Sequence, residues 1–313
     1  MQNPILWYLK GMAMGAADVV PGVSGGTIAF LMGIYERLLE AIGSFSLPVL
    51  RLLFKGKFKE FAQKTDLIFL IALFAGIATS FITLAKLFKY LLANHEILTM
   101  SFFFGLIIAT VWVVGRRIKE WNISTIIWFL IGAALAIGIS FSGQVEGSSN
   151  PFYLFFCGFI AICSMILPGV SGSFVLLLLG NYALVIGALS DLPSAILSLD
   201  VTAIMACLWI IIPFALGAIT GILSFAKVLS WLFHHYENSL LAILTGFVLG
   251  SLSIIYPWKK VLRSEIIHGK VKVLETMRYI PEIDTHFFMA LGLMLIGAIL
   301  VASIEYFGNK ELR

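Results

Sequence analysis

The residues best suited to chemistry in this chain form a short box of proline, glycine and serine that occurs twice. The first copy runs Pro21-Gly22-Val23-Ser24-Gly25-Gly26-Thr27, and the second runs Pro168-Gly169-Val170-Ser171-Gly172-Ser173. Proline and glycine interrupt a helix, and the residues after each interruption would begin a new one. The unpaired N–H groups and partial positive charge at a helix start suit an anion. The two boxes therefore indicate a site for a phosphate or a carboxylate.

Seven residues would bind this anion through hydroxyls and backbone N–H groups. They are Ser24, Gly25, Gly26, Thr27, Ser171, Gly172 and Ser173. Ser24 and Ser171 are placed to cap the two new helices, and glycine lets an anion approach the backbone. In the alternative interpretation, each box is only a bend that allows helices to pack closely. The presence of two related copies favours the anion site.

The elements that carry the boxes are long and apolar. Of 313 residues, 60% are hydrophobic and 12% are charged, with a mean hydropathy of +1.01, whereas about 25% of the residues in soluble domains are charged. Apolar stretches long enough to cross a bilayer as helices separate the charged segments. We therefore expect an all-α polytopic membrane protein, which excludes a soluble enzyme, a nucleic-acid-binding protein and a disordered chain.

The predicted order is one broken unit and three spans, followed by the same series again. The first broken unit covers 4–43, with its box region at 11–43, and the second covers 151–190. The predicted spans are 67–92, 97–115 and 124–143 in the first half, and 203–233, 239–257 and 285–307 in the second.

The two halves are related in sequence. A shift of 147 residues gives eight identities in the fifteen positions from Pro21 to Tyr35, and a shift of 141 places Lys86 on Lys227. If each half crosses the membrane an odd number of times, the second half is inverted relative to the first, as in many secondary transporters. We expect two inverted repeats, 1–146 and 147–313, each a re-entrant broken-helix hairpin plus three transmembrane helices.

Basic residues predict the orientation. Loop 44–66 carries five Lys and Arg and loop 115–123 carries three, whereas loops 143–150 and 191–200 carry none. The positive-inside rule then places the N-terminus and loop 44–66 in the cytoplasm. The segment 258–284 lies outside in this topology, yet it carries six Lys and Arg and runs against the rule.

Five ionisable residues near the boxes or the span ends are candidates for coupling or gating. They are Asp18, Glu36, Arg37, Lys86 and Lys227. Ionisable groups inside a membrane are costly unless paired or hydrated. Asp18 either titrates with a proton, pairs with Arg37, or accepts a local hydrogen bond from the interrupted backbone. Glu36 and Arg37 also fit an interfacial position, and the two lysines fit either snorkelling anchors or gates that attract a lipid headgroup.

Other chemistries lack their usual motifs. The five histidines show no metal-ligand spacing, so we predict no metal site and no cofactor. Nucleotide-binding glycine motifs are absent, which argues against an ATP-driven pump, and no acid–base set suggests an enzyme. The three cysteines lie in apolar stretches and are interpreted as packing residues.

The stretch GMAMGAADVVPGVSGGT from Gly11, with the following GIYE that ends at Glu36, resembles the signature of domain-of-unknown-function family 368. That family includes the PopT-type polyprenyl-phosphate transporters. The second box and the length also fit, so the resemblance covers essentially the whole chain. It implies a multi-pass protein of the bacterial cytoplasmic membrane with re-entrant inverted repeats. It also implies return of undecaprenyl phosphate, a carrier of peptidoglycan and other cell-envelope precursors, to the inner leaflet.

The leading hypothesis is therefore a lipid-phosphate flippase. The boxes would bind the phosphate of the polyprenyl lipid while its tail stays among the bilayer lipids, and rocking of the repeats would alternate access. Protons are the candidate coupling ion that the resemblance suggests. The alternative is a secondary transporter or channel for small anions, either phosphate or carboxylates, which needs a continuous polar path. A membrane enzyme acting on a lipid phosphate is the third hypothesis.

Overall fold

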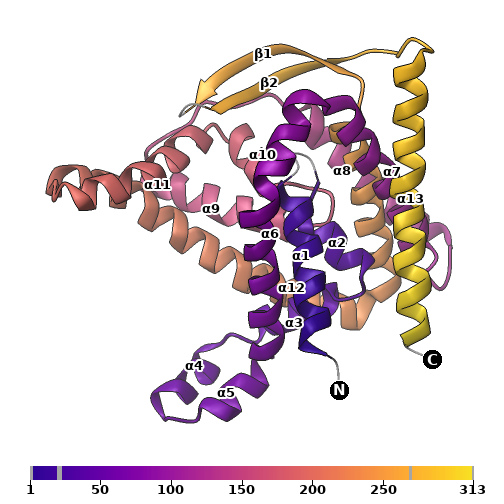
Figure 1. Ribbon diagram of the computed structural model, residues 1–313. Helices are drawn as coiled ribbons and strands as arrows, with labels where there is room; N and C mark the ends of the chain where they lie inside the picture. Colours follow the sequence, from indigo (N-terminus) through magenta and orange to yellow (C-terminus); the bar gives the residue numbers. More distant parts are fainter. Residues whose placement is uncertain (1–2, 20–22, 268–269, 312–313) are drawn as a thin grey trace.

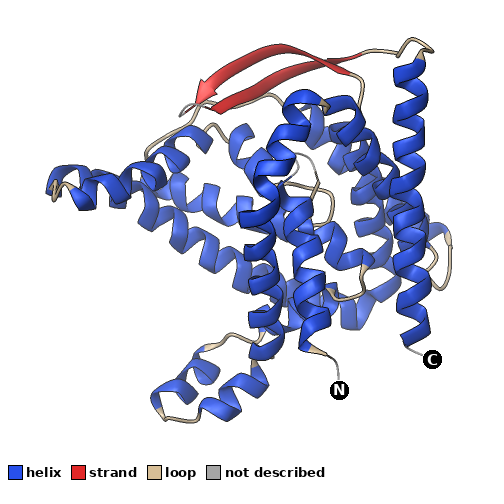
Figure 2. Cartoon of the chain, in the orientation of Figure 1, coloured by secondary structure: helices blue, strands red, loops and turns tan. Residues whose placement is uncertain are grey.

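The computed structural model describes residues 3–19, 23–267 and 270–311 (Figure 1). These residues form a helical bundle with one two-stranded β-hairpin (Figure 2). Both chain termini lie at one end of the bundle, here called the terminal end, and the hairpin lies over the opposite end, here called the hairpin end. The expectation of a helical polytopic protein is confirmed, with the hairpin as an addition that was not predicted.

The helices of the first half have the following bounds. They are α1 (Pro4–Val19), α2 (Gly25–Leu31), α3 (Tyr35–Gly43), α4 (Leu47–Phe54), α5 (Phe58–Lys64), α6 (Leu67–Asn94), α7 (Glu96–Gly115) and α8 (Ile123–Phe141). The elements of the second half are α9 (Pro151–Ile166), α10 (Gly172–Leu178), α11 (Tyr182–Leu197), α12 (Val201–Ile255), β1 (Lys259–Ile267), β2 (Lys270–Arg278) and α13 (Thr285–Glu311).

Membrane crossing is supported by helix length and composition. Among the described residues, α6, α7, α8, α12 and α13 are long and apolar enough to span, and the bent pair α10–α11 would make a sixth span. With 55 residues, α12 would be about 80 Å long if straight, more than twice the ~30 Å of a bilayer core. It bends at Tyr236, whose backbone is not helical. The two spans predicted at 203–233 and 239–257 are therefore joined through Tyr236 without a loop.

Three predicted boundaries were wrong. Loop 44–66 contains the short helices α4 and α5, and the second broken unit continues to Leu197, seven residues beyond its predicted end. The segment 258–284 contains the antiparallel pair β1–β2, in which Lys259 lies opposite Arg278. Residues 270–273 alternate Lys and Val, the period of a strand, so the sequence carries a local signal for this pair.

Several corresponding elements of the two halves have matching geometry, although α3 has 9 residues and α11 has 16. Helices α1 and α9 both have 16 residues, and α2 and α10 both have seven. His95, between α6 and α7, has φ −140° and ψ 45°, and Tyr236, 141 residues later, has φ −138° and ψ 43°. The offsets found in the sequence therefore also relate helix lengths and bends.

Glycines hold the broken units against their neighbouring spans. Where α1 crosses α6, a Cβ atom at Gly76 would lie 2.0 Å from the carbonyl oxygen of Tyr8. Where α9 crosses α12, a Cβ at Gly217 would lie 1.9 Å from the carbonyl oxygen of Phe155. Close approach of backbones through small residues is the usual packing of helices in membranes. Phe155 and Gly217 follow Tyr8 and Gly76 by the same offsets, 147 and 141.

The last span of each half packs on a helix of the other half. Helix α13 crosses α7 where a Cβ at Gly297 would lie 2.2 Å from the carbonyl oxygen of Phe102. Helix α8 crosses α12 where a Cβ at Gly132 would lie 2.1 Å from the carbonyl oxygen of Ile243. The two halves are therefore interlocked and do not form separate domains.

Candidate functional site

The two boxes are in contact inside the bundle. The buried Thr27 hydroxyl accepts a hydrogen bond from the backbone N–H of Gly169 (2.8 Å). The buried Tyr35 hydroxyl donates to the carbonyl oxygen of Ile166 (3.0 Å), and a Cβ at Gly26 would lie 2.9 Å from that same oxygen. The start of α2 therefore packs against the end of α9, which brings the two boxes together.

The start of α2 is occupied by groups of its own chain. The N-cap Ser24 accepts from Gly26 N–H (3.1 Å), as predicted, and the Asp18 carboxylate accepts from Gly25 N–H (2.6 Å). The N–H of Thr27 bonds to the carbonyl oxygen of Ser24 (2.9 Å). Of the interpretations of Asp18, the local hydrogen bond is therefore the one observed. Pro21 and Gly22 of this box lie outside the described residues.

The start of α10 differs from that of α2. Ser171 has the N-cap position, but its side chain makes no capping hydrogen bond, so the predicted cap was wrong. Its hydroxyl lies 3.0 Å from the hydroxyl of the exposed Ser173, a partner that Gly26 does not offer Ser24 in the first box. Met165 takes the position that corresponds to Asp18 and has no carboxylate. No described side chain caps α10, which leaves the second box more open than the first.

Two cations bind the other end of α2. The Arg117 guanidinium donates to the carbonyl oxygens of Leu31 (2.9 Å) and Phe30 (3.3 Å), and the Lys10 ammonium donates to that of Met32 (3.1 Å). Cations are favourable at a helix C-terminus because its carbonyl groups carry partial negative charge. Burial lowers the pKa of Arg117 and Glu305 acts in the opposite direction, but an arginine remains charged at neutral pH. In the sequence, Arg117 bears only on topology, and no local pattern indicates its contact with α2.

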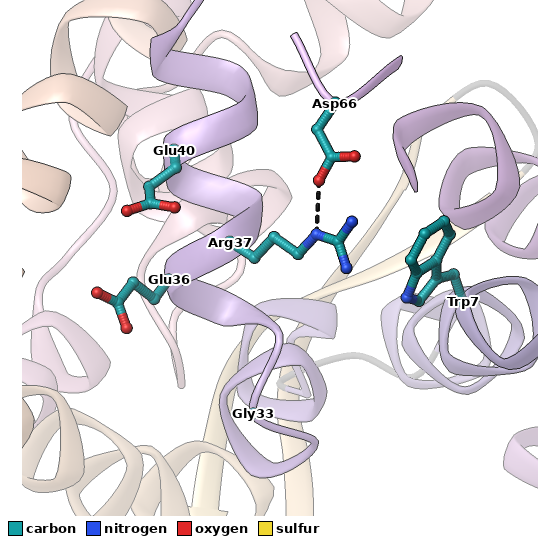
Figure 3. Close-up of a pocket in the computed structure, with 6 residues that line it drawn as sticks. All are labelled: Trp7, Gly33, Glu36, Arg37, Glu40 and Asp66. Carbon is teal, nitrogen blue, oxygen red and sulfur yellow. Dashed lines mark hydrogen bonds and ion pairs between the residues drawn. The ribbon is translucent and has the colours of Figure 1, made fainter. Parts of the chain in front are cut away.

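Two of the gating candidates lie in a cavity of about 720 Å³ at the terminal end (Figure 3). Its lining residues are Trp7, Gly33, Glu36, Arg37, Glu40 and Asp66. The Arg37 Nε pairs with Asp66 Oδ2 at 2.5 Å, and the guanidinium lies 4.3 Å from the centre of the Trp7 ring. The lining holds three carboxylates and one guanidinium, which gives it a negative formal charge, and Figure 3 shows Glu36 and Glu40 on the side of α3 away from the guanidinium. Asp66 was missed because it is distant in sequence from the boxes, and Glu40 was missed although it lies one turn after Glu36 inside the box region.

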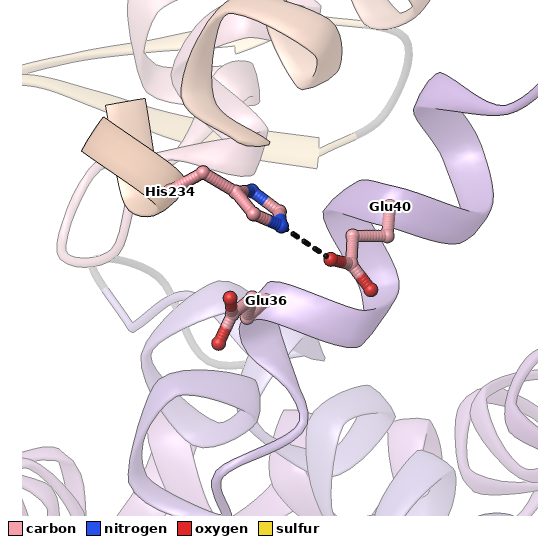
Figure 4. Close-up of side chains that lie close together, drawn as sticks. All are labelled: Glu36, Glu40 and His234. Atoms are coloured by element: carbon pink, nitrogen blue, oxygen red, sulfur yellow. Dashed lines mark ion pairs between the residues drawn. The ribbon is translucent and has the colours of Figure 1, made fainter. Parts of the chain in front are cut away.

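A second group of charges joins the two halves at the terminal end (Figure 4). Glu36 and Glu40 lie one turn apart on α3, and His234 of α12 places its Nε2 3.4 Å from Glu40 Oε1. The other ring nitrogen lies 2.8 Å from the Ser230 carbonyl oxygen, which fixes the orientation of the ring. This ion pair forms only when the imidazole is protonated.

Of the two symmetry-related lysines, Lys227 lies away from the boxes. Lys227 is exposed and lines a cavity of about 490 Å³ with Trp231 and His235, next to Gly43 of α3. Lys86 belongs to α6, and its side chain lies outside what the structure describes. Their predicted gating role stays a prediction.

Comparison with known proteins identifies the family. The model of the VCA0040-like family, described as undecaprenyl phosphate translocase-like, matches residues 14–273, which contain both boxes. The chain belongs to this family. It is 40% identical over 316 aligned residues to a polyprenyl-phosphate transporter of Vibrio cholerae, with 98% of each chain covered.

A second relative is more distant. The chain is 33% identical over 261 residues to a polyprenyl-phosphate transporter of Staphylococcus aureus, with 80% of this chain and 85% of the relative covered. No solved structure matches this member of the translocase-like family.

Proposed function

We propose that this chain translocates undecaprenyl phosphate across the bacterial cytoplasmic membrane and so recycles the carrier lipid for cell-envelope synthesis. The observation that carries the proposal is the 40% identity, over 98% of both chains, to a polyprenyl-phosphate transporter. The spanning helices and the two broken units in contact within the bundle fit transport of a lipid headgroup. We predict no enzymatic activity and no cofactor or metal requirement. The resemblance to family 368 and its PopT-type members stays a prediction.

We infer that residues 1–146 and 147–313 are inverted repeats. The equal lengths of α1 and α9, the matched bends at His95 and Tyr236 and the matched glycine contacts support a common plan. Helix α6 leads away from the terminal end, whereas the first part of α12 leads back toward it (Figure 1). Opposite directions of corresponding helices are what an inverted repeat requires.

The phosphate group would first meet the second box. Ser171 and Ser173 present two neighbouring hydroxyls, and Gly172 lies between them without a side chain. In the first box the N–H groups of Gly25, Gly26 and Thr27 already have acceptors. The hydroxyl oxygens of Ser24 and Thr27 already accept hydrogen bonds from backbone N–H groups. We propose that they join the site only after Asp18 leaves the N–H of Gly25. The two boxes therefore contribute unequally to phosphate binding. The second box has Ser173 where the first has Gly26, and Met165 stands where the first half has Asp18.

Coupling and gating remain part of the proposal. Protonation of Asp18 would remove the charge that holds Gly25 N–H, which would link a proton to opening of the first box. Glu36 and Arg37 would act as a gate at the terminal end, where Arg37 must leave Asp66 before it can attract a phosphate. Lys86 and Lys227 would attract the headgroup near the span ends.

Competitive binding measured by native mass spectrometry tests the function. Purified protein in detergent is offered undecaprenyl phosphate together with phosphatidylglycerol and inorganic phosphate. We expect selective retention of undecaprenyl phosphate, with loss of that preference in the Ser171→Ala, Ser173→Ala double variant. Ser194→Ala is the matched control, since its exposed hydroxyl bonds only locally to the Asp191 carbonyl among the contacts described. Retention of inorganic phosphate without lipid preference would favour the small-anion transporter, and an unchanged preference in the double variant would refute the site.

A further inference from the structure

The segment between α3 and α6 forms a helical hairpin that stands apart from the bundle. Helices α4 and α5 extend sideways at the terminal end (Figure 1). They contact each other, and α5 contacts the start of α6. At their base the Phe45 and Phe61 rings meet edge to face, 6.0 Å between centroids, and Phe61 is buried. The rest of the hairpin reaches away from the spans.

The tip of this hairpin has a fixed shape. Its sequence is Phe54-Lys55-Gly56-Lys57-Phe58. Helix α4 ends with hydrogen bonds from Lys57 N–H to the carbonyl of Leu52 and from Gly56 N–H to that of Leu53. Gly56 has φ +70°, which only glycine adopts without strain. This is the Schellman arrangement, which closes a helix and fixes the direction of the chain that follows. The tip residues are therefore held in place.

The apolar residues of the tip are unpartnered. Phe54 is 92% exposed and Phe58 is 66% exposed, on either side of the turn, and Leu47 at the start of α4 is 75% exposed. Elsewhere in this chain, large exposed apolar side chains lie mainly on the spanning helices, where lipid covers them. A fixed loop tip that exposes two phenylalanines needs an apolar environment like the lipid around the spanning helices.

The charge around the tip is strongly positive. Five exposed cations, Arg51, Lys55, Lys57, Lys59 and Lys64, share residues 47–65 with a single acid, Glu60, for a net charge of +4. Glu60 pairs with Lys57 at 2.8 Å and leaves four cations in excess. Phenylalanine beside lysine is the composition of segments that lie in the headgroup layer of anionic membranes.

We propose that the α4–α5 hairpin is a docking surface for anionic phospholipids at the terminal end. Phe54 and Phe58 enter the boundary between headgroups and acyl chains, and Lys55, Lys57 and Lys59 bind lipid phosphates. Helix α6 begins at Leu67, three residues after α5 ends, so α5 lies where the bilayer surface begins. The sideways direction of the hairpin carries its tip over the lipid and away from the protein. A second copy of the chain, or another protein docked here, would need negative charge to complement this positive hairpin. The hairpin of a second copy carries the same positive charge and cannot supply it.

Spin labelling tests this surface without the carrier lipid, so its outcome is independent of the proposed function. Nitroxides are placed by Phe54→Cys, Phe58→Cys or, as the matched control, Gln63→Cys, which is exposed on α5 away from the tip. The full chain carries Cys157→Ala, Cys163→Ala and Cys207→Ala so that only the new thiol is labelled. Each protein is reconstituted in vesicles of phosphatidylcholine with or without phosphatidylglycerol.

We expect the labels at 54 and 58 to gain accessibility to oxygen and lose accessibility to a water-soluble nickel chelate when phosphatidylglycerol is present. High salt, or Lys55→Gln, Lys57→Gln and Lys59→Gln together, should reverse that shift, and the label at 63 should not respond. Labels at 54 and 58 that remain accessible to the nickel chelate in anionic vesicles would overturn the proposal. Label-to-label contact between copies that does not depend on lipid charge would overturn it in favour of a protein interface.

Discussion

The contact between α1 and α6 gives the sharpest quantitative prediction. Gly76→Ala would place a Cβ 2.0 Å from the carbonyl oxygen of Tyr8 and 2.8 Å from the backbone nitrogen of Met12. Real Cβ contacts essentially never fall below 3.0 Å, and backbone atoms cannot rotate away as a side chain can. Helix α1 must therefore move by about 1 Å from α6. Overpacking of this kind costs about 1–3 kcal/mol.

The cost can be separated from the intrinsic effect of the substitution. Alanine is a better helix former than glycine by about 1 kcal/mol. Gly138→Ala in α8 is the matched control, because a Cβ there would meet no atom within 4 Å. The difference in stability between the two variants therefore reports packing alone. Gly217→Ala, at the corresponding α9–α12 crossing, should behave like Gly76→Ala.

Thermal unfolding in detergent measures the effect. For chains of 150–250 residues, 1 kcal/mol corresponds to about 2–4 °C in Tm, so we expect Gly76→Ala and Gly217→Ala to lose several degrees. Gly138→Ala should stay at or above the wild-type Tm. Equal Tm values for Gly76→Ala and Gly138→Ala would refute the close approach of α1 and α6, and with it the positioning of the first box by that contact.

Substitutions at four further positions test the site, each by thermal unfolding. Thr27→Val leaves the buried N–H of Gly169 without its acceptor and should cost about 1–3 kcal/mol, whereas Thr27→Ser should be milder; equal losses would show that the hydroxyl does not matter. Tyr35→Phe should cost about 0.5–1.5 kcal/mol through the lost bond to α9, and no change would contradict that bond. Arg117→Ala should cost about 1–3 kcal/mol, with Arg117→Lys intermediate; a neutral Arg117→Ala would argue against the α2 contact. Asp18→Ala should destabilise more than Asp18→Asn, because an amide oxygen can still accept from the N–H of Gly25, and the reverse order would contradict this role.

The sequence determined the class of protein and the position of its breaks. Apolar stretches of spanning length leave few alternatives to membrane helices, and proline with glycine must interrupt them. Repetition of the box was visible as identities at fixed offsets, and the same offsets recur in the crossings at Gly76 and Gly217. The Ser24 cap was also predictable, since capping depends on residues two or three positions apart.

The tertiary structure decided which groups meet. Contacts such as Thr27 with Gly169, Arg117 with Leu31 and Glu40 with His234 join residues far apart in the chain, and no local pattern encodes them. The two boxes look alike in sequence, yet Asp18 closes one start and Met165 leaves the other open. That difference arises because the Asp18 carboxylate, seven residues before Gly25, can accept from the Gly25 N–H only when α1 and α2 fold against one another. Local sequence therefore determines where a helix can begin, and packing determines whether its N–H groups remain available.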